Sequence, residues 1–348
     1  MGKKPKLVST EMIHKFANEH GIELSTAESV LWLSLVLREI SASSIGKDFA
    51  LIGGSAIVFL YQDMYRFSTD LDLDFIGDKN LGKKSSKEVD KRIVKDEEVF
   101  REIALTLGLK FKKKNKRDRF VQYELHFSTR LTGMIELDVS YLYCHSILGT
   151  VMKDWRMEAG GLVKPFKVKT QKLEELYAGK ITAVVATVEP KEHLDFKKGI
   201  GLLFKKKARH LFDIYQLMTD IAEKKTEIKF ELLHELVVLF GMTRIKNFEY
   251  RRGDALGEYT EEQFVVELYP VLSGDAIPDP EVIKWEVRKF FDARIFNWSE
   301  KEHRFIEDFK HKLFRPEDLF GKGDVANQIK NMHYYKEIME KIIPFRKP

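Results

Sequence analysis

Apolar residues recur with a helical spacing near the start of the chain and then change to the spacing of strands. A capping-box pattern from Ser25 to Glu28 predicts the start of a helix whose apolar positions reach Ile40. Short apolar or alternating runs typical of strands follow at 49–52, 71–76, 120–127 and 134–141, and helical spacing covers 55–61 and 98–109. Up to about residue 150, this order predicts a sheet of about three to five strands with flanking helices.

From about residue 171 onward, nearly all apolar spacing is helical. It predicts helices at 171–188, 208–222, 231–240, 281–291 and 301–314, with a turn-rich linker at 273–280. We therefore predict an α/β (α+β) core with a mixed sheet, followed by a mostly helical C-terminal domain. The predicted domains are 1–165, which includes the N-terminal helices, and 166–348.

Composition narrows the class of protein. The 348 residues are 44% hydrophobic and 32% charged, which allows a buried core and excludes disorder and collagen-like repeats. The sequence contains no run of about 20 apolar residues, the length needed to span a membrane. The charged N-terminus lacks the apolar core of a secretory signal. Cys144 is the only cysteine, so neither an internal disulfide nor a thiolate zinc site can form. We expect a cytoplasmic protein without a membrane partner.

The net charge of +5 is too small to indicate nucleic-acid binding by itself. Two runs concentrate the positive charge, at Lys110–Arg119 and Lys205–Arg209. Each run is either a solvated loop or helix end, or a patch that contacts phosphate groups.

An alternating acidic segment is the most informative part of the sequence. Asp70 and Asp72 share one face of the predicted strand, about 7 Å apart, while the intervening leucines face the other way. Neighbouring carboxylates repel each other unless a cation lies between them, and Mg²⁺ binds one or two carboxylates together with substrate phosphates. The alternative is a strand whose acids face water. The alternation continues to Asp74, which we expect to lie at the strand end on the surface.

A third carboxylate would complete a site for two metal ions. The segment Met134–Tyr141 offers Asp138, which lies between apolar residues in a strand pattern. Glu136 lies on the same face and is the competing choice. We favour Asp138 because its apolar neighbours indicate a central strand.

A second motif precedes the acidic strand. Gly53 and Gly54 allow a close approach of the backbone to a ligand, and the helix behind them directs free N–H groups outward. The hydroxyl of Ser55 is a further donor. Together with the acidic strand, this arrangement predicts a site for a nucleoside triphosphate with Mg²⁺.

A segment at 77–84 nearly matches the phosphate-binding P-loop pattern. Lys84 occupies the position where a Ser or Thr must contact Mg²⁺, and the polar stretch behind it lacks an apolar helix face. We therefore disfavour a P-loop.

Five motifs in order resemble the AbiEii/AbiGii nucleotidyltransferase toxins, which are DNA polymerase β-like nucleotidyltransferases and relatives of the MenT toxins. The motifs are GGSA at 53–56, RFSTDLDL at 66–73, ELDVSY at 136–141, LYAGKITA at 176–183 and ARHLFDIYQL at 208–217. The resemblance covers about residues 50–220, and it implies a polymerase β-like nucleotidyltransferase core.

The resemblance implies a role for each matched residue. Gly54 and Ser55 would hold the triphosphate, and Asp70 and Asp72 would bind Mg²⁺. Asp138 would be the third ligand or the base near the attacking hydroxyl.

Two later residues match the family's helical motifs. The resemblance implies that Lys180 meets the nucleotide phosphates and that Asp213 is catalytic. From the residues alone, Lys180 could instead extend to solvent, and Asp213 could pair with Arg209 within one helix.

The resemblance implies a Mg²⁺-dependent enzyme that transfers nucleotides from an NTP to an RNA acceptor, the tRNA 3′ end in particular, and that releases pyrophosphate. It also implies a toxin of a toxin–antitoxin or abortive-infection system, with an antitoxin encoded nearby. An alternative is an NTP-binding or protein-nucleotidylating module of the same fold. Aromatic residues near the first basic run could stack on bases, among them Tyr123. The candidate RNA contacts are Lys112, Lys113, Lys114, Lys116 and Arg209.

Overall fold

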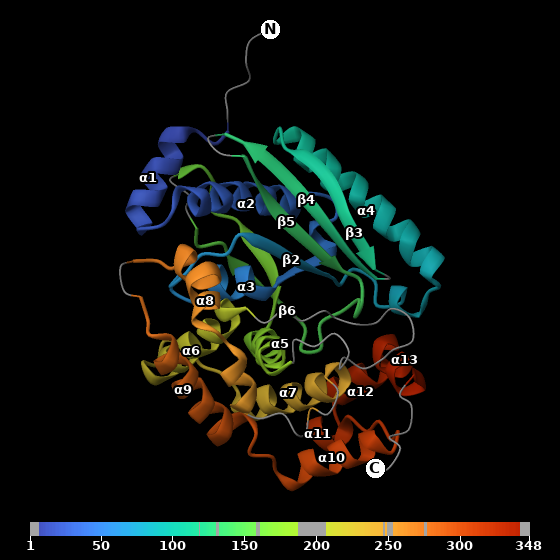
Figure 1. Cartoon of the computed structure of the whole chain (residues 1–348). Helices are drawn as coiled ribbons and strands as arrows, with labels where there is room; N and C mark the ends of the chain where they lie inside the picture. The colour runs from blue at the N-terminus through green and yellow to red at the C-terminus, as the bar shows by residue number, and fades with distance from the viewer. Residues whose placement is uncertain are drawn as a thin grey trace. The chain divides into compact units, whose positions relative to one another are not determined.

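The structure is a computed structural model, and it describes residues 7–117, 119–129, 132–157, 161–186, 207–245, 248, 253–274 and 277–341. The chain forms two compact units (Figure 1). The first unit comprises Met1–Gln171 together with Tyr269–Ile277, and the second comprises Lys172–Leu268 and Pro278–Pro348.

The first unit contains the sheet and the helices that cover it, with short 3₁₀ and π turns labelled η. Its elements are α1 (Thr10–His20), α2 (Leu24–Ala42), η1 (Gly46–Asp48), β1 (Phe49–Ile52), α3 (Gly53–Ala56), η2 (Ile57–Tyr61), β2 (Asp70–Phe75), η3 (Leu81–Lys83), α4 (Ser86–Thr106), β3 (Lys110–Arg117), β4 (Phe120–Ser128), β5 (Thr132–Ser140), β6 (Thr150–Asp154), β7 (Lys167–Gln171) and η8 (Tyr269–Val271).

Within the described residues the strands form one mixed seven-stranded sheet in the order β3-β4-β5-β2-β1-β7-β6. Strand β2 pairs in parallel with β5, and β1 pairs in parallel with β7, while the other neighbours are antiparallel. The fold class predicted from the sequence is confirmed, but the expected number of strands was too low. The missed strands β3, β6 and β7 are rich in lysine or short, so they lack the apolar alternation that marks the others.

One face of the sheet is apolar and is covered by α2 and α4. Phe49 of β1 packs against Phe75 of β2 and Phe100 of α4, with ring centroids 5.6 and 5.5 Å apart. Helix α2 is buried over most of its length. Because side chains alternate along β2, its aspartates lie on the opposite face.

Two helix starts differ from the sequence predictions. Helix α2 begins at Leu24 without a side-chain cap, and Glu28 is instead buried, where its carboxylate accepts a hydrogen bond of 3.2 Å from the Thr129 backbone N–H. Helix α4 begins at Ser86, well before the predicted 98, because Ser85 and Glu88 form a capping box. The capping box of α4 therefore lies in the charged stretch behind residue 84, where the sequence showed no apolar helix face.

The predicted linker at 273–280 partly belongs to the first unit. The backbone N–H of Phe67 donates to the Val271 carbonyl oxygen at 2.6 Å, and that of Ser273 donates to the Tyr65 carbonyl oxygen at 2.9 Å. These bonds attach residues distant in sequence to the loop that leads into the acidic strand.

The second unit is helical throughout its described residues. Its elements are α5 (Leu173–Val185), α6 (Ala208–Ala222), α7 (Phe230–Arg244), η6 (Gly253–Glu258), α8 (Glu261–Gln263), η7 (Phe264–Leu268), α9 (Pro280–Phe290), η9 (Phe291–Ile295), α10 (Glu300–Lys310), α11 (Glu317–Phe320), α12 (Asp324–Asn331) and α13 (His333–Lys341). Helix α5 packs against α6 and α7. Among the described residues, no helix is both long and apolar enough to cross a membrane.

Candidate active site

The turn after β1 fits closely against the acidic strand. Ile52, the last residue of β1, pairs with Asp72 of β2, which brings the following Gly53 beside the Asp72 side chain. Gly53 has φ of +70°, and a Cβ added there would overlap the Asp72 carboxylate and lie 2.9 Å from its Cγ. Both the backbone conformation and the neighbouring carboxylate therefore require glycine at this position.

Ser55 has a structural contact that the sequence did not predict. Its side chain is fully buried, and its hydroxyl donates to the Asp70 carbonyl oxygen. The hydroxyl thus attaches α3 to β2 and does not present a free donor. No side chain caps α3, so the backbone N–H groups of Gly53, Gly54 and Ser55 are the groups that a ligand could contact there.

Two rows of polar side chains cross the acidic face of the sheet. In the parallel pair of β2 and β5, Asp72 stands beside Asp138, and Asp70 stands beside Glu136. Strand β4 continues each row, with Gln122 opposite Asp138 and Glu124 opposite Glu136. Residues in register share a face, so the structure brings the predicted carboxylates of β2 and β5 together.

Asp138 lies in a strongly perturbed environment on this face. Burial, and next the charge of Asp72, raise the pKa of Asp138 to about 7, while a hydrogen bond from Gln122 acts in the opposite direction. The Gln122 Nε2 atom lies 3.1 and 3.2 Å from the two carboxylate oxygens. The carboxylate is therefore held in place and is shared between protonated and ionised forms near neutral pH.

Glu136, the competing choice, has a cationic partner. Lys114 of β3 forms an ion pair with Glu136, and its Nζ atom lies 3.6 Å from Glu124. Lys112 approaches Glu124 at 3.1 Å from the other side. The charge of Glu136 is therefore compensated by a lysine of β3.

The first basic run is an edge strand, so the expectation of a loop or helix end was wrong. Four of its lysines form ion pairs: beside Lys112 and Lys114, Lys113 lies 2.6 Å from Glu97 and Lys116 lies 2.5 Å from Asp90. Nearby acids thus offset much of its charge. The second run lies partly outside the described residues, and its Arg209 lies in the first turn of α6.

Two further expectations about the surface were wrong. Asp74 is 6% exposed and accepts a hydrogen bond of 2.9 Å from Gln171, so it belongs to the interior. Tyr123 is fully buried and packs against Phe111, with ring centroids 5.1 Å apart, so it cannot stack on a base.

Lys180 and Asp213 form a buried ion pair in the second unit. Lys180 of α5 approaches Asp213 of α6 with an N···O distance of 2.9 Å, and their side chains are 8% and 0% exposed. Lys180 therefore does not extend to solvent, and Asp213 is not part of a surface pair. The contact joins two helices that the family motifs had marked separately.

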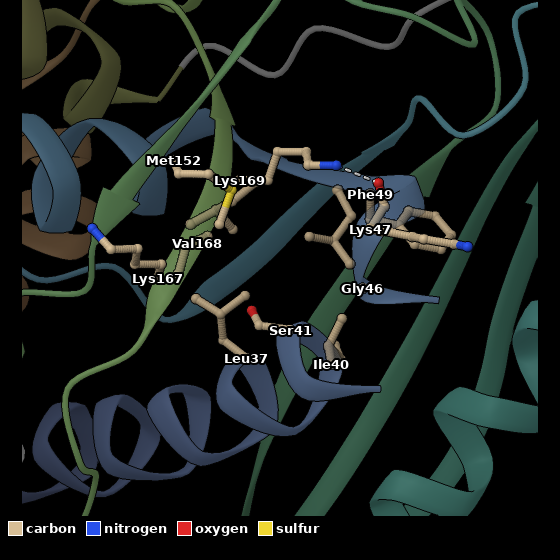
Figure 2. Close-up of a pocket in the computed structure, with 12 residues that line it drawn as sticks. Leu37, Ile40, Ser41, Gly46, Lys47, Phe49, Met152, Lys167, Val168 and Lys169 are labelled. Atoms are coloured by element: carbon tan, nitrogen blue, oxygen red, sulfur yellow. Dashed lines mark hydrogen bonds between the residues drawn. The ribbon is translucent and has the colours of Figure 1, made fainter. Parts of the chain in front are cut away.

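Figure 2 shows a cavity of about 320 Å³ whose walls include Leu37 and Ile40 of α2. Leu51 and Leu73 of the sheet also line it. Leu73 lies between Asp72 and Asp74 in β2, so its side chain points to the opposite face. The cavity is therefore separate from the acidic site.

The described residues contain no group of three or more His, Cys, Asp or Glu side chains arranged to hold a metal ion. The donor set nevertheless fits a divalent cation. Asp72 and Asp138 are oxygen donors in register, and burial together with the charge of Asp72 raises the pKa of Asp138, which a bound cation would lower.

Comparison with protein families matches residues 35–313 to the nucleotidyl transferase AbiEii toxin of type IV toxin–antitoxin systems. The chain belongs to the AbiEii family. The family resemblance stated from the motifs is confirmed, and the match extends beyond the region where they were found. The AbiEii chain is thus a nucleotidyltransferase toxin of the type IV class, which implies an NTP substrate and an antitoxin partner.

Two solved structures are similar to this chain to different degrees. MenT4, a nucleotidyltransferase toxin from Mycobacterium tuberculosis H37Rv, is similar with a TM-score of 0.57 at 16% identity, over 86% of this chain and 93% of that chain. JHP933 from Helicobacter pylori has a TM-score of 0.44 at 15% identity, over 88% of this chain and 98% of that chain. No curated protein matches the sequence.

Gln122 is the site residue that sequence reasoning missed. Gln122 is uncharged and belongs to no recognised motif. Only its polar position in the alternation of buried and less buried residues along β4 could have indicated it.

Proposed function

We propose that this toxin transfers a nucleotide from an NTP to a hydroxyl of an RNA acceptor, at the 3′ end of tRNA. The observation that carries the proposal is the register of Asp72 with Asp138, with the Gly53 turn packed against Asp72. The choice of RNA and of the tRNA end follows the family resemblance. The cytoplasm, where both substrates occur, is the proposed compartment.

Asp70, Asp72 and Asp138 are the proposed ligands of Mg²⁺. Bound Mg²⁺, as two ions, would offset charge on the phosphates and lower the pKa of the attacking hydroxyl. Burial and the charge of Asp72 raise the pKa of Asp138, and this supports the assignment because a bound cation would stabilise the ionised carboxylate against both effects.

The chain's own groups bind and orient the reactants. The backbone N–H groups of Gly53, Gly54 and Ser55 would donate to triphosphate oxygens. In the transfer, the acceptor oxygen bonds to the α-phosphorus, the bond from that phosphorus to the bridging oxygen breaks, and pyrophosphate leaves. The hydroxyl proton would pass to the Asp138 carboxylate, which stands beside Asp72 in the parallel pair of β2 and β5.

Three further residues complete the proposal. Lys180 and Asp213 contribute to catalysis as a pair, with Lys180 meeting the nucleotide phosphates, as the resemblance implies. Their buried contact of 2.9 Å supports a joint role. Arg209, near the start of the same helix as Asp213, contacts RNA.

The RNA backbone would contact the edge strand β3. The contacts are Lys112, Lys113, Lys114 and Lys116. Their side chains are 60%, 36%, 40% and 31% exposed, which supports their access to phosphate groups in spite of their ion pairs.

Labelled NTPs incubated with the protein, total tRNA and cell lysate test the proposal, because the label can enter RNA, protein or neither. We expect label at the tRNA 3′ end, and its loss in Asp72→Asn. Asp154→Asn, which removes an exposed carboxylate from β6, is the matched control and should transfer normally. Label in protein would favour the protein-nucleotidylating alternative, and transfer by Asp72→Asn at the normal rate would exclude this site.

A further inference from the structure

The two polar rows on the acidic face differ in how their carboxylates are compensated. In the row that contains Glu136, this carboxylate is paired with Lys114 of β3. In the row that contains Asp138, the neighbour on β4 is Gln122, an amide without charge. The same sheet thus gives one carboxylate of β5 a cationic partner and the other an uncharged donor.

The contact between Gln122 and Asp138 is specific in its geometry. The amide nitrogen lies within hydrogen-bond distance of both carboxylate oxygens, at 3.1 and 3.2 Å. Asp72 stands on the other side of Asp138 in the same row. The carboxylate is therefore held between a donor and a like charge, which fixes the direction in which it presents its oxygens.

A neutral donor suits this position better than a cation would. A lysine would hold the carboxylate as firmly, but its charge would cancel the negative charge that a substrate-bound cation or a hydroxyl proton requires. An amide fixes the side chain without removing that charge. Glu136, with Lys114 beside it, lacks this property.

We propose that Gln122 is a positioning residue that orients the Asp138 carboxylate for transfer and makes Asp138, not Glu136, the third carboxylate of the site. The inference rests on the proposed function, because it assumes that Asp138 acts in transfer.

The first experiment separates positioning from folding by kinetics. Gln122→Leu keeps the side-chain size and removes the donor, and we expect kcat to fall about 3- to 10-fold, the effect of removing one hydrogen bond. The KM for NTP should stay within about two-fold, because ground-state binding is unaffected. The matched control is Asn115→Leu. Asn115 lies on β3 opposite Gln122, and the loss of its amide should leave kcat unchanged.

Two further variants test the role of charge. Gln122→Lys should lose more activity than Gln122→Leu, because the added cation neutralises Asp138. Gln122→His, which retains a ring N–H donor, should recover part of the lost kcat. Equal kcat in wild type and Gln122→Leu, or full activity in Gln122→Lys, would overturn the proposal.

The second experiment needs no activity. Gln122→Leu should lower the Tm by roughly 2–4 °C in the wild-type background. It should not lower the Tm in Asp138→Ala, where the acceptor is absent. An equal decrease in both backgrounds would mean that the Gln122 side chain only packs, and would overturn the positioning role.

The outcomes for Asp138 separate the two proposals. If Asp138→Ala abolishes transfer but Gln122→Leu leaves it intact, this inference alone is overturned. Transfer that Asp138→Ala leaves intact overturns the role of Asp138 in the proposed function, and the Tm comparison would then still report whether the contact exists.

Discussion

At the scale of residues, the site depends on close contacts between neighbours on adjacent strands. Gly53 has no alternative, because any side chain there would meet the carboxylate of Asp72. Asp138 is influenced by both of its neighbours in the row, since Asp72 raises its pKa and Gln122 lowers it. The pKa of this carboxylate therefore reports on both of its neighbours.

Asp138 should make the stability of the metal-free protein depend on pH. Its folded-state pKa of about 7 exceeds the ordinary value of 3.8, so the folded chain binds a proton that the unfolded chain releases between these values. Stability should therefore fall as the pH rises through this window and level off above it. With chelator present, Asp138→Asn should melt higher than wild type at about pH 8 and equally at about pH 4.

Thermal melts across this pH range provide the check. Asp154→Asn, an exposed carboxylate on β6, is the control and should follow the wild-type curve. Parallel curves for wild type and Asp138→Asn would show that the carboxylate is not perturbed.

At the scale of elements, contacts between elements changed two of the sequence interpretations. The basic run became the edge strand β3, whose lysines pair with acids on α4, β4 and β5. Lysines on an exposed edge also discourage pairing with other chains. Helices α5 and α6 are joined by the Lys180–Asp213 pair, which neither helix predicts alone.

Breaking the Lys180–Asp213 pair should destabilise the protein whatever its catalytic role. Asp213→Ala leaves a buried cation without its partner and should cost about 3–5 kcal/mol in the free energy of unfolding. The double variant Lys180→Met with Asp213→Leu removes both charges and should recover most of that stability. Denaturant titration measures the difference.

The double variant also separates stability from catalysis. If the pair acts in transfer, the double variant stays inactive although it is folded. Normal turnover in the double variant would limit the pair to a structural role and remove both residues from the catalytic set.

The lysines of β3 predict the salt dependence of RNA binding. Replacing Lys112, Lys113, Lys114 and Lys116 together by Gln should weaken tRNA binding and flatten the plot of log K against log salt. The slope should change by up to about 0.7 for each phosphate group that the variant no longer neutralises. NTP affinity should change little. An unchanged slope in filter-binding assays would mean that RNA binds to another surface.

At the scale of the whole molecule, the sheet extends beyond the domain boundary predicted at residue 165. Strand β7 lies between β1 and β6, and the segment Tyr269–Ile277 also belongs to the first unit. A cut at that boundary would separate β7 from both of its neighbours.

We therefore expect a fragment of residues 1–165 to lack cooperative unfolding, because β6 loses its partner and β1 loses one of its two neighbouring strands. Circular dichroism during heating tests this against the full chain. A fragment with a sharp transition at the temperature of the full chain would show that β7 is dispensable and that the predicted boundary marks a folding unit.

The sequence by itself determined the features that depend on local spacing and local chemistry. The alternation of Asp70 and Asp72 with leucines, the Gly53 turn and the helical second half follow from residue periods and turn preferences, and the motifs identified the family. Only the tertiary structure decided which strands lie beside each other. The parallel pairing of β2 with β5 brought Asp72 to Asp138, and the same sheet supplied Gln122 from β4 and Lys114 from β3. Strand order, register and the partners of charged groups depend on packing between distant segments, and no local pattern specifies them.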